Sequence, residues 1–450
     1  MGSVRLVRDS STHSRMTFRQ RRLTGAYAVA HGAAEFLAAL TLFSLFINAN
    51  ISAVQIVVYS VLAFGCPILF AAVFGGRKGA IPEGTVGLVG AVLMAAGMPL
   101  GILGLAGWAS VLGLGLGSAL LHLAAGTATL KMPNKGTAVG VFESLGAPAL
   151  ALGTVLGLND WRAEAMSTWT ILCAAIMLMA GLAIAAWGSV AENPGIDASS
   201  ATESTTAELA AAQAWRDADA ALSNHSAENA LTGATLMASS GKGKVLGKLL
   251  GWVTGARLPT SASWSLGGGA GPAPLIALLA LVAISVARAF TYACAPQAWK
   301  MDVGMVLVAA LVIGLGRALG GLMADGMGFA AAAVVSFLAA SLFLGSGRAW
   351  AGLVGLLFLS CTMAPIILGL LASTRRPALT FGLAQLCQVP AAFVGTYLFS
   401  SYAGFDLAGR MILGSSVNFV PGVTAWVLMS CLVLVFVVRP LDPWRTNVAA

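Results

Sequence analysis

Twelve long apolar runs constrain this chain more than any other feature of its sequence. A membrane-spanning helix needs about 20 apolar residues, and each run is near that length. Because lipid offers the backbone no hydrogen-bond partners, a spanning segment must be a helix or a strand of a closed barrel. The runs are continuous rather than alternating, which favours helices. Charged residues make up only 9% of the 450 residues, which excludes an ordinary water-soluble domain. The sequence therefore predicts an all-α polytopic protein of the lipid bilayer.

The runs fall into two sets of six, separated by a polar stretch that is rich in Ser, Thr, Gly and Pro. We predict the runs at 24–48, 52–75, 83–104, 106–129, 136–158, 166–190, 273–296, 301–324, 326–345, 349–373, 377–402 and 411–438. The predicted domains are a basic N-terminal stretch at 1–23, a six-helix half at 24–190, a cytoplasmic linker at 191–272, a second six-helix half at 273–438 and a tail at 439–450. Within the linker, residues 242–258 have the pattern of an amphipathic basic helix on a membrane surface.

Lysine and arginine are distributed unequally over the loops that this arrangement creates. Nineteen fall on the side of the N-terminus and four on the other side. Cytoplasmic loops are enriched in these residues, so we expect both termini in the cytoplasm and the protein in the bacterial cytoplasmic (inner) membrane. The net charge of +8 then reflects topology and attraction to anionic lipid, and no nucleic-acid partner is expected.

A short internal repeat indicates that one half is a duplicate of the other. Pro148–Leu156 reads PALALGTVL, and Pro390–Leu398, 242 residues later, reads PAAFVGTYL. Gly140 and Gly382 match at the same offset. Because both copies fall in the fifth run of a half, the sequence predicts two halves that are built alike.

Twelve spans in a 6+6 duplication, with a long linker and both ends inside, resemble the major facilitator superfamily. The resemblance covers nearly the whole chain and implies a substrate site near the midplane between two halves that rock to alternate access. The loop GGRKGA at Gly75–Ala80 and its counterpart GRALGGLMADGMG at Gly316–Gly328 are degenerate forms of the family's gating loop. They imply gating roles for Arg77, Arg317 and Asp325.

Three segments are similar to a narrower group, the fosmidomycin-resistance-like exporters. His31 and Glu35 stand where that group has His-x-x-x-Asp, and GSALLHLAAG places His122 at the histidine of the group's fourth helix. The segment KGTAVGVFESLGAPALALG at Lys135–Gly153 resembles the helix that follows. Together with the glycines and proline of the fifth run, this resemblance favours export over uptake. The group's substrate is not carried over to this chain.

Four ionisable residues lie inside apolar runs of the first half: His31, Glu35, His122 and Glu143. An ionised side chain at the bilayer centre costs about 2.5–3.5 kcal/mol, so such residues usually face a cavity or a partner. At a rise of about 1.5 Å per residue, three of them lie at a similar depth and Glu35 about one turn deeper. Carboxylates and imidazoles exchange protons, and we predict that these four residues couple transport to protons, with Glu35 foremost. The alternative is a buried network that only ties the helices together.

Three polar side chains of the second half are predicted to bind solute. Arg288, near the middle of the seventh run, keeps its charge and needs an anion, which is either Glu35 or a group of the solute. An interhelical salt bridge is the structural alternative. Gln385 and Gln388 in the eleventh run can hydrogen-bond solute or pack between helices.

These expectations combine into a secondary active transporter that exports a small solute, anionic or amphipathic, by proton-coupled antiport. The alternatives are a proton-coupled uptake permease and a non-transporting receptor or assembly subunit on the same fold. The chain has no HExxH motif and no nucleophile elbow, so neither enzyme activity nor a catalytic residue is predicted. The six cysteines are scattered, so we predict no metal site and no cofactor. Expected partners are the solute, protons and lipid, with the protein acting as a monomer.

Overall fold

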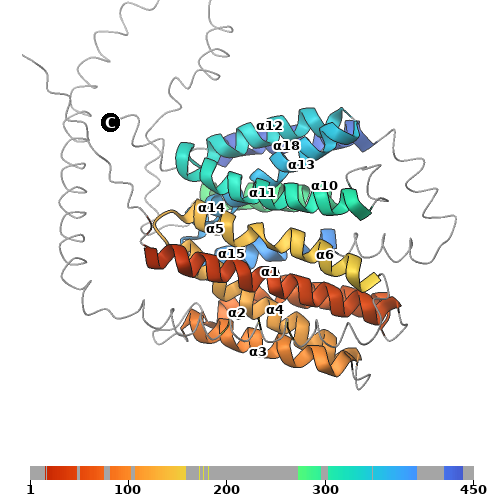
Figure 1. Cartoon of the computed structure of the whole chain (residues 1–450). Helices are drawn as coiled ribbons and strands as arrows, with labels where there is room; N and C mark the ends of the chain where they lie inside the picture. The colour runs from red at the N-terminus through yellow and green to blue at the C-terminus, as the bar shows by residue number, and fades with distance from the viewer. Residues whose placement is uncertain are drawn as a thin grey trace, which may run out of the picture. The chain divides into compact units, whose positions relative to one another are not determined.

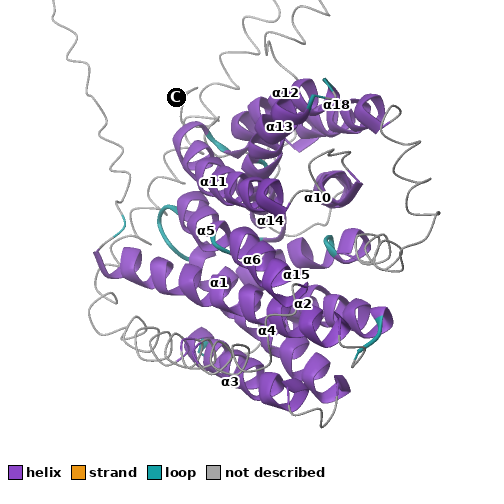
Figure 2. Cartoon of the chain, turned by 45° about the vertical axis from the view of Figure 1, so that its right-hand side comes forward, coloured by secondary structure: helices purple, strands orange, loops and turns teal. Residues whose placement is uncertain are grey.

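The computed structural model describes residues 16, 18–47, 51–74, 82–102, 107–158, 172, 176, 181, 272–294, 303–346, 348–392 and 420–438. All regular structure in these ranges is α-helical, as Figure 2 shows. The helices are α1 (Phe18–Ile47), α2 (Ala53–Phe74), α3 (Glu83–Ile102), α4 (Gly107–Leu130), α5 (Lys135–Ser144), α6 (Gly146–Leu158), α10 (Pro272–Cys294), α11 (Val303–Met327), α12 (Phe329–Gly345), α13 (Ala349–Cys361), α14 (Met363–Thr374), α15 (Pro377–Leu386) and α18 (Val420–Val438). We call α1–α6 the first half and α10–α18 the second half.

Most of the predicted runs correspond to helices that can cross a membrane. Among the described residues, seven helical stretches are long and apolar enough: Gln20–Phe46, Val54–Val73, Glu83–Leu100, Gly107–Leu130, Lys135–Leu158, Gly304–Met327 and Trp350–Thr374. Two shorter apolar helical segments, Ile276–Thr291 and Phe329–Gly345, accompany them. The prediction of an all-helical, multi-pass membrane protein is thus confirmed. The total of twelve spans and the side on which the termini lie stay predictions, and nearly all of the run at 166–190 lies outside the described residues.

One face of α11 shows how the helices meet their surroundings. Leu311, Leu315 and Leu322 have exposed fractions of 61%, 63% and 56%, and their spacing places them along one side of the helix. In water such a stripe of exposed leucine would be unfavourable, whereas in a bilayer it faces acyl chains. The exposed apolar surface therefore agrees with the membrane location that the composition predicts.

Three helices end four residues before a proline. The helices α5, α13 and α15 end at Ser144, Cys361 and Leu386, and the prolines that follow are Pro148, Pro365 and Pro390. A proline has no backbone N–H and its ring clashes with the carbonyl four residues earlier, so the helix is interrupted there. As a result, the predicted runs at 136–158 and 349–373 are each two helices, α5 with α6 and α13 with α14, rather than one.

The helices repeat at the same interval as the sequence. The bounds of α15 are those of α5 shifted by 242 residues, which is also the offset between PALALGTVL and PAAFVGTYL. Each of the two helices packs across to the other half: α5 against α11, and α15 against α2. Figure 1 shows α5 and α6 lying between α1 and α11.

Glycines allow these two contacts between the halves to be close. A Cβ atom added to Gly140 on α5 would lie 2.6 Å from the backbone oxygen of Arg317 on α11. A Cβ added to Gly382, the matching glycine on α15, would lie 2.8 Å from Cα of Ile68 on α2. Real Cβ atoms essentially never come so near, so both positions need a glycine at the present helix separation.

By its internal contacts the chain divides into two units, one of Met1–Ala191 with Pro272–Ala450 and one of Glu192–Gly271. The described helices belong to the first unit. The second unit contains the predicted linker and its amphipathic segment, and it lies outside the described residues.

Candidate functional site

A cavity of about 500 Å³ lies between residues of the two halves. Its lining is largely apolar, with a small number of ionisable and amide side chains. All four predicted proton-coupling residues and all three predicted solute-binding residues line it: His31, Glu35, His122, Glu143, Arg288, Gln385 and Gln388. Arg317, one of the predicted gating residues, lines it as well. A largely apolar pocket with a few convergent polar groups is the usual form of a small-molecule site.

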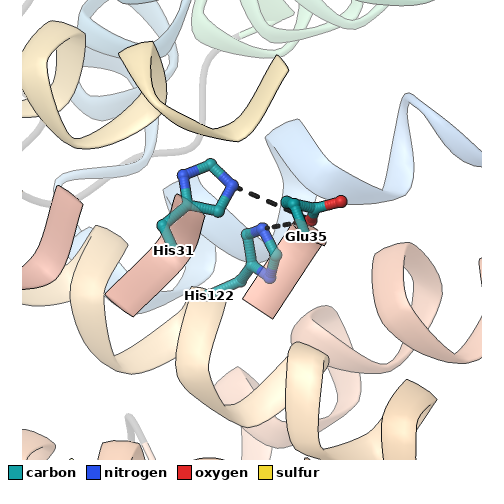
Figure 3. Close-up of side chains that lie close together, drawn as sticks. All are labelled: His31, Glu35 and His122. Carbon is teal, nitrogen blue, oxygen red and sulfur yellow. Dashed lines mark ion pairs between the residues drawn. The ribbon is translucent and has the colours of Figure 1, made fainter. Parts of the chain in front are cut away.

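Three of these residues meet in the first half: His31 and Glu35 of α1 and His122 of α4. Figure 3 shows both imidazole rings beside the Glu35 carboxylate. Nε2 of His122 is 3.3 Å from Oε1 of Glu35, and Nε2 of His31 is 3.8 Å from the same oxygen. The exposed fractions are 3% for His31, 6% for Glu35 and 2% for His122. We call this group the His–Glu–His cluster.

A hydrogen bond from Nδ1 to a backbone oxygen fixes how each imidazole ring is oriented toward Glu35. Nδ1 of His31 lies 2.9 Å from the backbone oxygen of Phe142, and Nδ1 of His122 lies 2.8 Å from the backbone oxygen of Ser118. A carbonyl oxygen can only accept, so Nδ1 carries the hydrogen in both rings. In a neutral ring, Nε2 then presents a lone pair to the Glu35 carboxylate. With both rings neutral, three acceptor atoms face one another, and a proton or another cation shared between them removes the repulsion.

Glu143 of α5 belongs to a different group of contacts, which crosses between the halves. Nη1 of Arg317 on α11 donates to Oε2 of Glu143 at 3.1 Å and to its backbone oxygen at 3.0 Å. Nε2 of Gln385 on α15 lies 3.5 Å from Oε1 of Glu143. Glu143 and Gln385 are 242 residues apart, so they occupy equivalent positions in the repeat. We call Glu143, Arg317 and Gln385 the cross-half group.

The other end of α5 is also held from the second half. The backbone N–H groups of Gly136 and Thr137 donate to Oδ1 and Oδ2 of Asp325 at 2.9 and 2.7 Å. The first N–H groups of a helix lack partners within the helix, and the partial positive charge there favours a carboxylate. Two residues of α11, Arg317 and Asp325, therefore hold opposite ends of α5. These are two of the three predicted gating residues; the third, Arg77, lies outside the described residues.

The predicted solute-binding residues lie on the second-half side of the cavity. Arg288 on α10 has an exposed fraction of 2%, and its Nη2 donates to Sδ of Met363 at 2.8 Å. Of the two predicted anions for Arg288, Glu35 faces the same cavity, and its own ion pairs are with the two histidines. The roles of Arg288, Gln385 and Gln388 toward a solute stay predictions.

Sequence reasoning missed the positioning roles of Phe142 and Gly146. The Phe142 ring stacks on His31 with 4.7 Å between centroids, and the Phe142 carbonyl accepts from the same histidine. A Cβ added to Gly146 would lie 2.5 Å from Cε1 of His31, so this glycine makes room for the ring. The only sequence signal was that both residues flank the proline-interrupted junction of α5 and α6. A backbone carbonyl as a partner leaves no trace in the sequence.

Comparison with known proteins gives a likeness at the level of the fold. No protein-family model matches the chain, and no curated protein matches it either. The human organic anion transporter MFSD10 (TETRAN) is similar in structure, with a TM-score of 0.51 at 14% identity, over 93% of this chain and 100% of that one. The transporter FucP of the major facilitator superfamily, in its outward conformation, gives a TM-score of 0.44 at 12% identity, over 92% of this chain and 98% of that one.

The narrower resemblance to fosmidomycin-resistance-like exporters stays a prediction. Identities this low concern the fold alone. Together with the apolar helices, the likeness to the human transporter leads to one conclusion: this multi-pass membrane protein shares the fold of that transporter.

Proposed function

We propose that the protein is a secondary active transporter that moves a small solute across the bacterial cytoplasmic membrane by alternating access. The observation that carries the proposal is a largely apolar cavity lined by residues of both halves, with buried ionisable groups on its wall. Transporters of this architecture bind solute between repeated halves and expose it to either side as the halves rock.

The contacts made by α11 with α5 supply the gate in this proposal. Asp325 binds the first turn of α5, and Arg317 binds Glu143 near its last turn. The lysine-rich loop before α5 is predicted to lie in the cytoplasm. With these contacts formed, the cavity is closed toward the cytoplasm, and opening to that side requires all of them to separate.

Proton coupling acts through Glu143 in this proposal, because its charge holds the gate. The ionised carboxylate pairs with Arg317, and Gln385 approaches its other oxygen. A proton on Glu143 removes the ion pair and weakens the link between α5 and α11. Protons that enter from outside thus favour opening to the cytoplasm, where they leave and solute binds, which is the order required for export. The His–Glu–His cluster stays a further predicted site of proton exchange.

The cavity wall favours a solute that is partly apolar. Gln388, Gln385 and Arg288 offer it hydrogen bonds from the second half, and Arg288 offers a positive charge. We therefore propose an anionic or amphipathic solute, for which the human relative in structure, named as an organic anion transporter, is a precedent by name only.

A reversible cross-link across the gate tests alternating access. Thr137 donates its backbone N–H to Asp325 at 2.7 Å, so these two positions lie at the contact between α5 and α11. In a background without the six native cysteines, we expect oxidation of Thr137→Cys/Asp325→Cys to stop solute flux in liposomes and reduction to restore it. The two single-cysteine variants, treated in the same way, are the controls. Full flux through the cross-linked protein would contradict a rocking mechanism at this gate.

A further inference from the structure

We propose that His31, Glu35 and His122 form a binding site for a divalent transition-metal ion. The proposal goes beyond transport and concerns what the purified protein binds. No sequence motif predicts this site, because His122 follows Glu35 by 87 residues in the chain and no metal-ligand spacing connects them. Folding of α4 against α1 creates the group.

The donor set and the distances suit a metal ion. Two imidazole nitrogens and one carboxylate oxygen are a well-known set of protein ligands for zinc. The three potential ligand atoms lie within 4.8 Å of one another, and one pair is 3.3 Å apart. Bonds of about 2.0–2.1 Å in tetrahedral geometry place ligand atoms about 3.3 Å apart. One pair therefore already has the required spacing, and Nε2 of His31 is 3.8 Å from the same carboxylate oxygen.

The contacts behind the two rings are those of metal-binding histidines. Histidines that bind metals almost always donate their other N–H to a carbonyl or carboxylate, which fixes the tautomer and the ring orientation. Here Nδ1 of His31 binds the Phe142 carbonyl and Nδ1 of His122 binds the Ser118 carbonyl. Both Nε2 lone pairs are thereby directed at the Glu35 carboxylate. Such an arrangement of three converging acceptors is stabilised when a cation lies between them.

The site has room for a fourth ligand. All three residues line the cavity, so an ion inside it can contact them directly. Structural zinc sites usually have four protein ligands, whereas three leave a position for water or another ligand. We infer that this fourth position faces the cavity.

The ligand chemistry selects among ions. Imidazole suits Zn²⁺, Co²⁺ and Ni²⁺, whereas Mg²⁺ and Ca²⁺ prefer six or more oxygen ligands, which these three residues do not provide. We therefore expect the site to bind Zn²⁺, Co²⁺ and Ni²⁺, and we expect Mg²⁺ and Ca²⁺ not to compete with them.

Metal titration of the purified full-length chain tests the proposal. The other two histidines, His13 and His225, are first replaced by Gln so that they contribute no ligand. We expect one equivalent of Zn²⁺ by calorimetry, and one equivalent of Co²⁺ with the visible absorption of tetrahedral coordination. Glu35→Gln and His122→Gln should each lower the Zn²⁺ affinity more than about 100-fold. Loss of a residue that only hydrogen-bonds a metal ligand typically costs about 10- to 100-fold, so a larger loss indicates a direct ligand.

Two further variants keep the test decisive. Glu83→Gln removes a carboxylate that pairs with Lys131 and does not line the cavity, and it should keep the affinity within a few-fold. Glu35→Asp keeps a carboxylate and should bind with an intermediate affinity, which decides the case if Glu35→Gln fails to fold. Absence of binding, binding that ignores the cluster substitutions, or equal competition by Mg²⁺ would overturn the site. Failure of the cross-linking test with metal binding intact would overturn the transport proposal alone.

Discussion

The cavity wall contains two groups of ionisable side chains that differ in how they relate to the halves. The His–Glu–His cluster is built from α1 and α4, both in the first half. The cross-half group joins α5 of the first half to α11 and α15 of the second. A motion that rocks one half against the other leaves the first group unchanged and must break the second. We therefore propose stable binding geometry for the first group and conformational coupling for the second.

Anchoring follows the same division, whereas burial sets apart only Arg317, because Glu143 and Gln385 are as buried as the cluster. In the His–Glu–His cluster both rings are held by backbone carbonyls, and all three side chains are nearly inaccessible. In the cross-half group, the Arg317 side chain remains 17% exposed and reaches Glu143 with a single nitrogen. A partly exposed ion pair is easier to separate, because water can solvate the charges as they part.

The largest expected effect is on coupling, from Glu143→Gln. Gln keeps the shape of the side chain but loses the charge that pairs with Arg317. We expect uphill solute transport on a pH gradient to fall at least about tenfold, while solute exchange at equal pH continues, because Gln cannot take up and release the proton that opens the gate in this proposal. Flux measurements in liposomes check this.

Glu83→Gln is the matched control, because Glu83 pairs with the half-exposed Lys131 and does not line the cavity. If Glu143→Gln still moved solute uphill, the coupling role would pass from the cross-half group to the His–Glu–His cluster, and the comparison would fail.

The second-largest effect is expected from Gly140→Ala, which adds a methyl group at the contact between α5 and α11. In Gly140→Ala the new Cβ would lie 2.6 Å from the Arg317 backbone oxygen, which cannot rotate away. We expect the closed α5–α11 contact to lose about 3 kcal/mol, the upper end for overpacking, and the population to shift toward the state that is open to the cytoplasm. Spectroscopic distances between labels on the two halves measure the shift. Zn²⁺ affinity should not change, and a matching loss of metal binding would show that the two groups are not independent.

The converse test places a methyl group beside the His–Glu–His cluster. In Gly146→Ala the Cβ would lie 2.5 Å from Cε1 of His31, a side chain that can move. The cost should therefore be lower, about 1–2 kcal/mol, and should appear as weaker Zn²⁺ binding with the gate unaffected. Calorimetry and the same label distances report both effects. Unchanged metal affinity would mean that Zn²⁺ binding does not depend on the present position of the His31 ring.

The smallest effect is expected from Asp325→Asn. The amide oxygen still accepts one hydrogen bond from α5, but the charge at the helix N-terminus is lost. Interactions of this kind contribute about 0.3–1 kcal/mol, so the gate should open only slightly more often. Cross-linking rates between cysteines on the two halves are sensitive enough to detect this, and a complete loss of gate closure would contradict the estimate.

Much of the fold could be predicted because its elements depend on local sequence. A run of apolar residues becomes a helix in lipid whatever its neighbours are, and the described runs do so. The interruptions were less predictable. Pro67 and Pro99 lie inside the continuous helices α2 and α3, whereas Pro148 and Pro365 follow interruptions. The presence of a proline therefore does not by itself decide whether a helix is broken.

The site residues could be selected from the sequence, but their grouping could not. Charged and imidazole side chains in apolar runs are costly, which picked out Glu35, His122 and Glu143. Sequence reasoning treated them as one set with His31, because three of the four lie at a similar depth and Glu35 lies about one turn deeper. The structure brings Glu35 and His122 together and gives Glu143 to Arg317, a partner 174 residues away.

The sequence by itself determined that the chain lies in lipid, where its helices and its repeat fall, and which ionisable residues need a partner inside the bilayer. Each of these features depends on composition or on neighbours within a few turns. The sequence also placed His31 and Glu35 on one face, since four residues make about one helical turn. Only the tertiary structure decided that α4 brings a second histidine to Glu35 and that α11 holds both ends of α5. Those contacts depend on how helices distant in the chain pack, and close approach at glycines such as Gly140 sets that packing through shape rather than through any local signal.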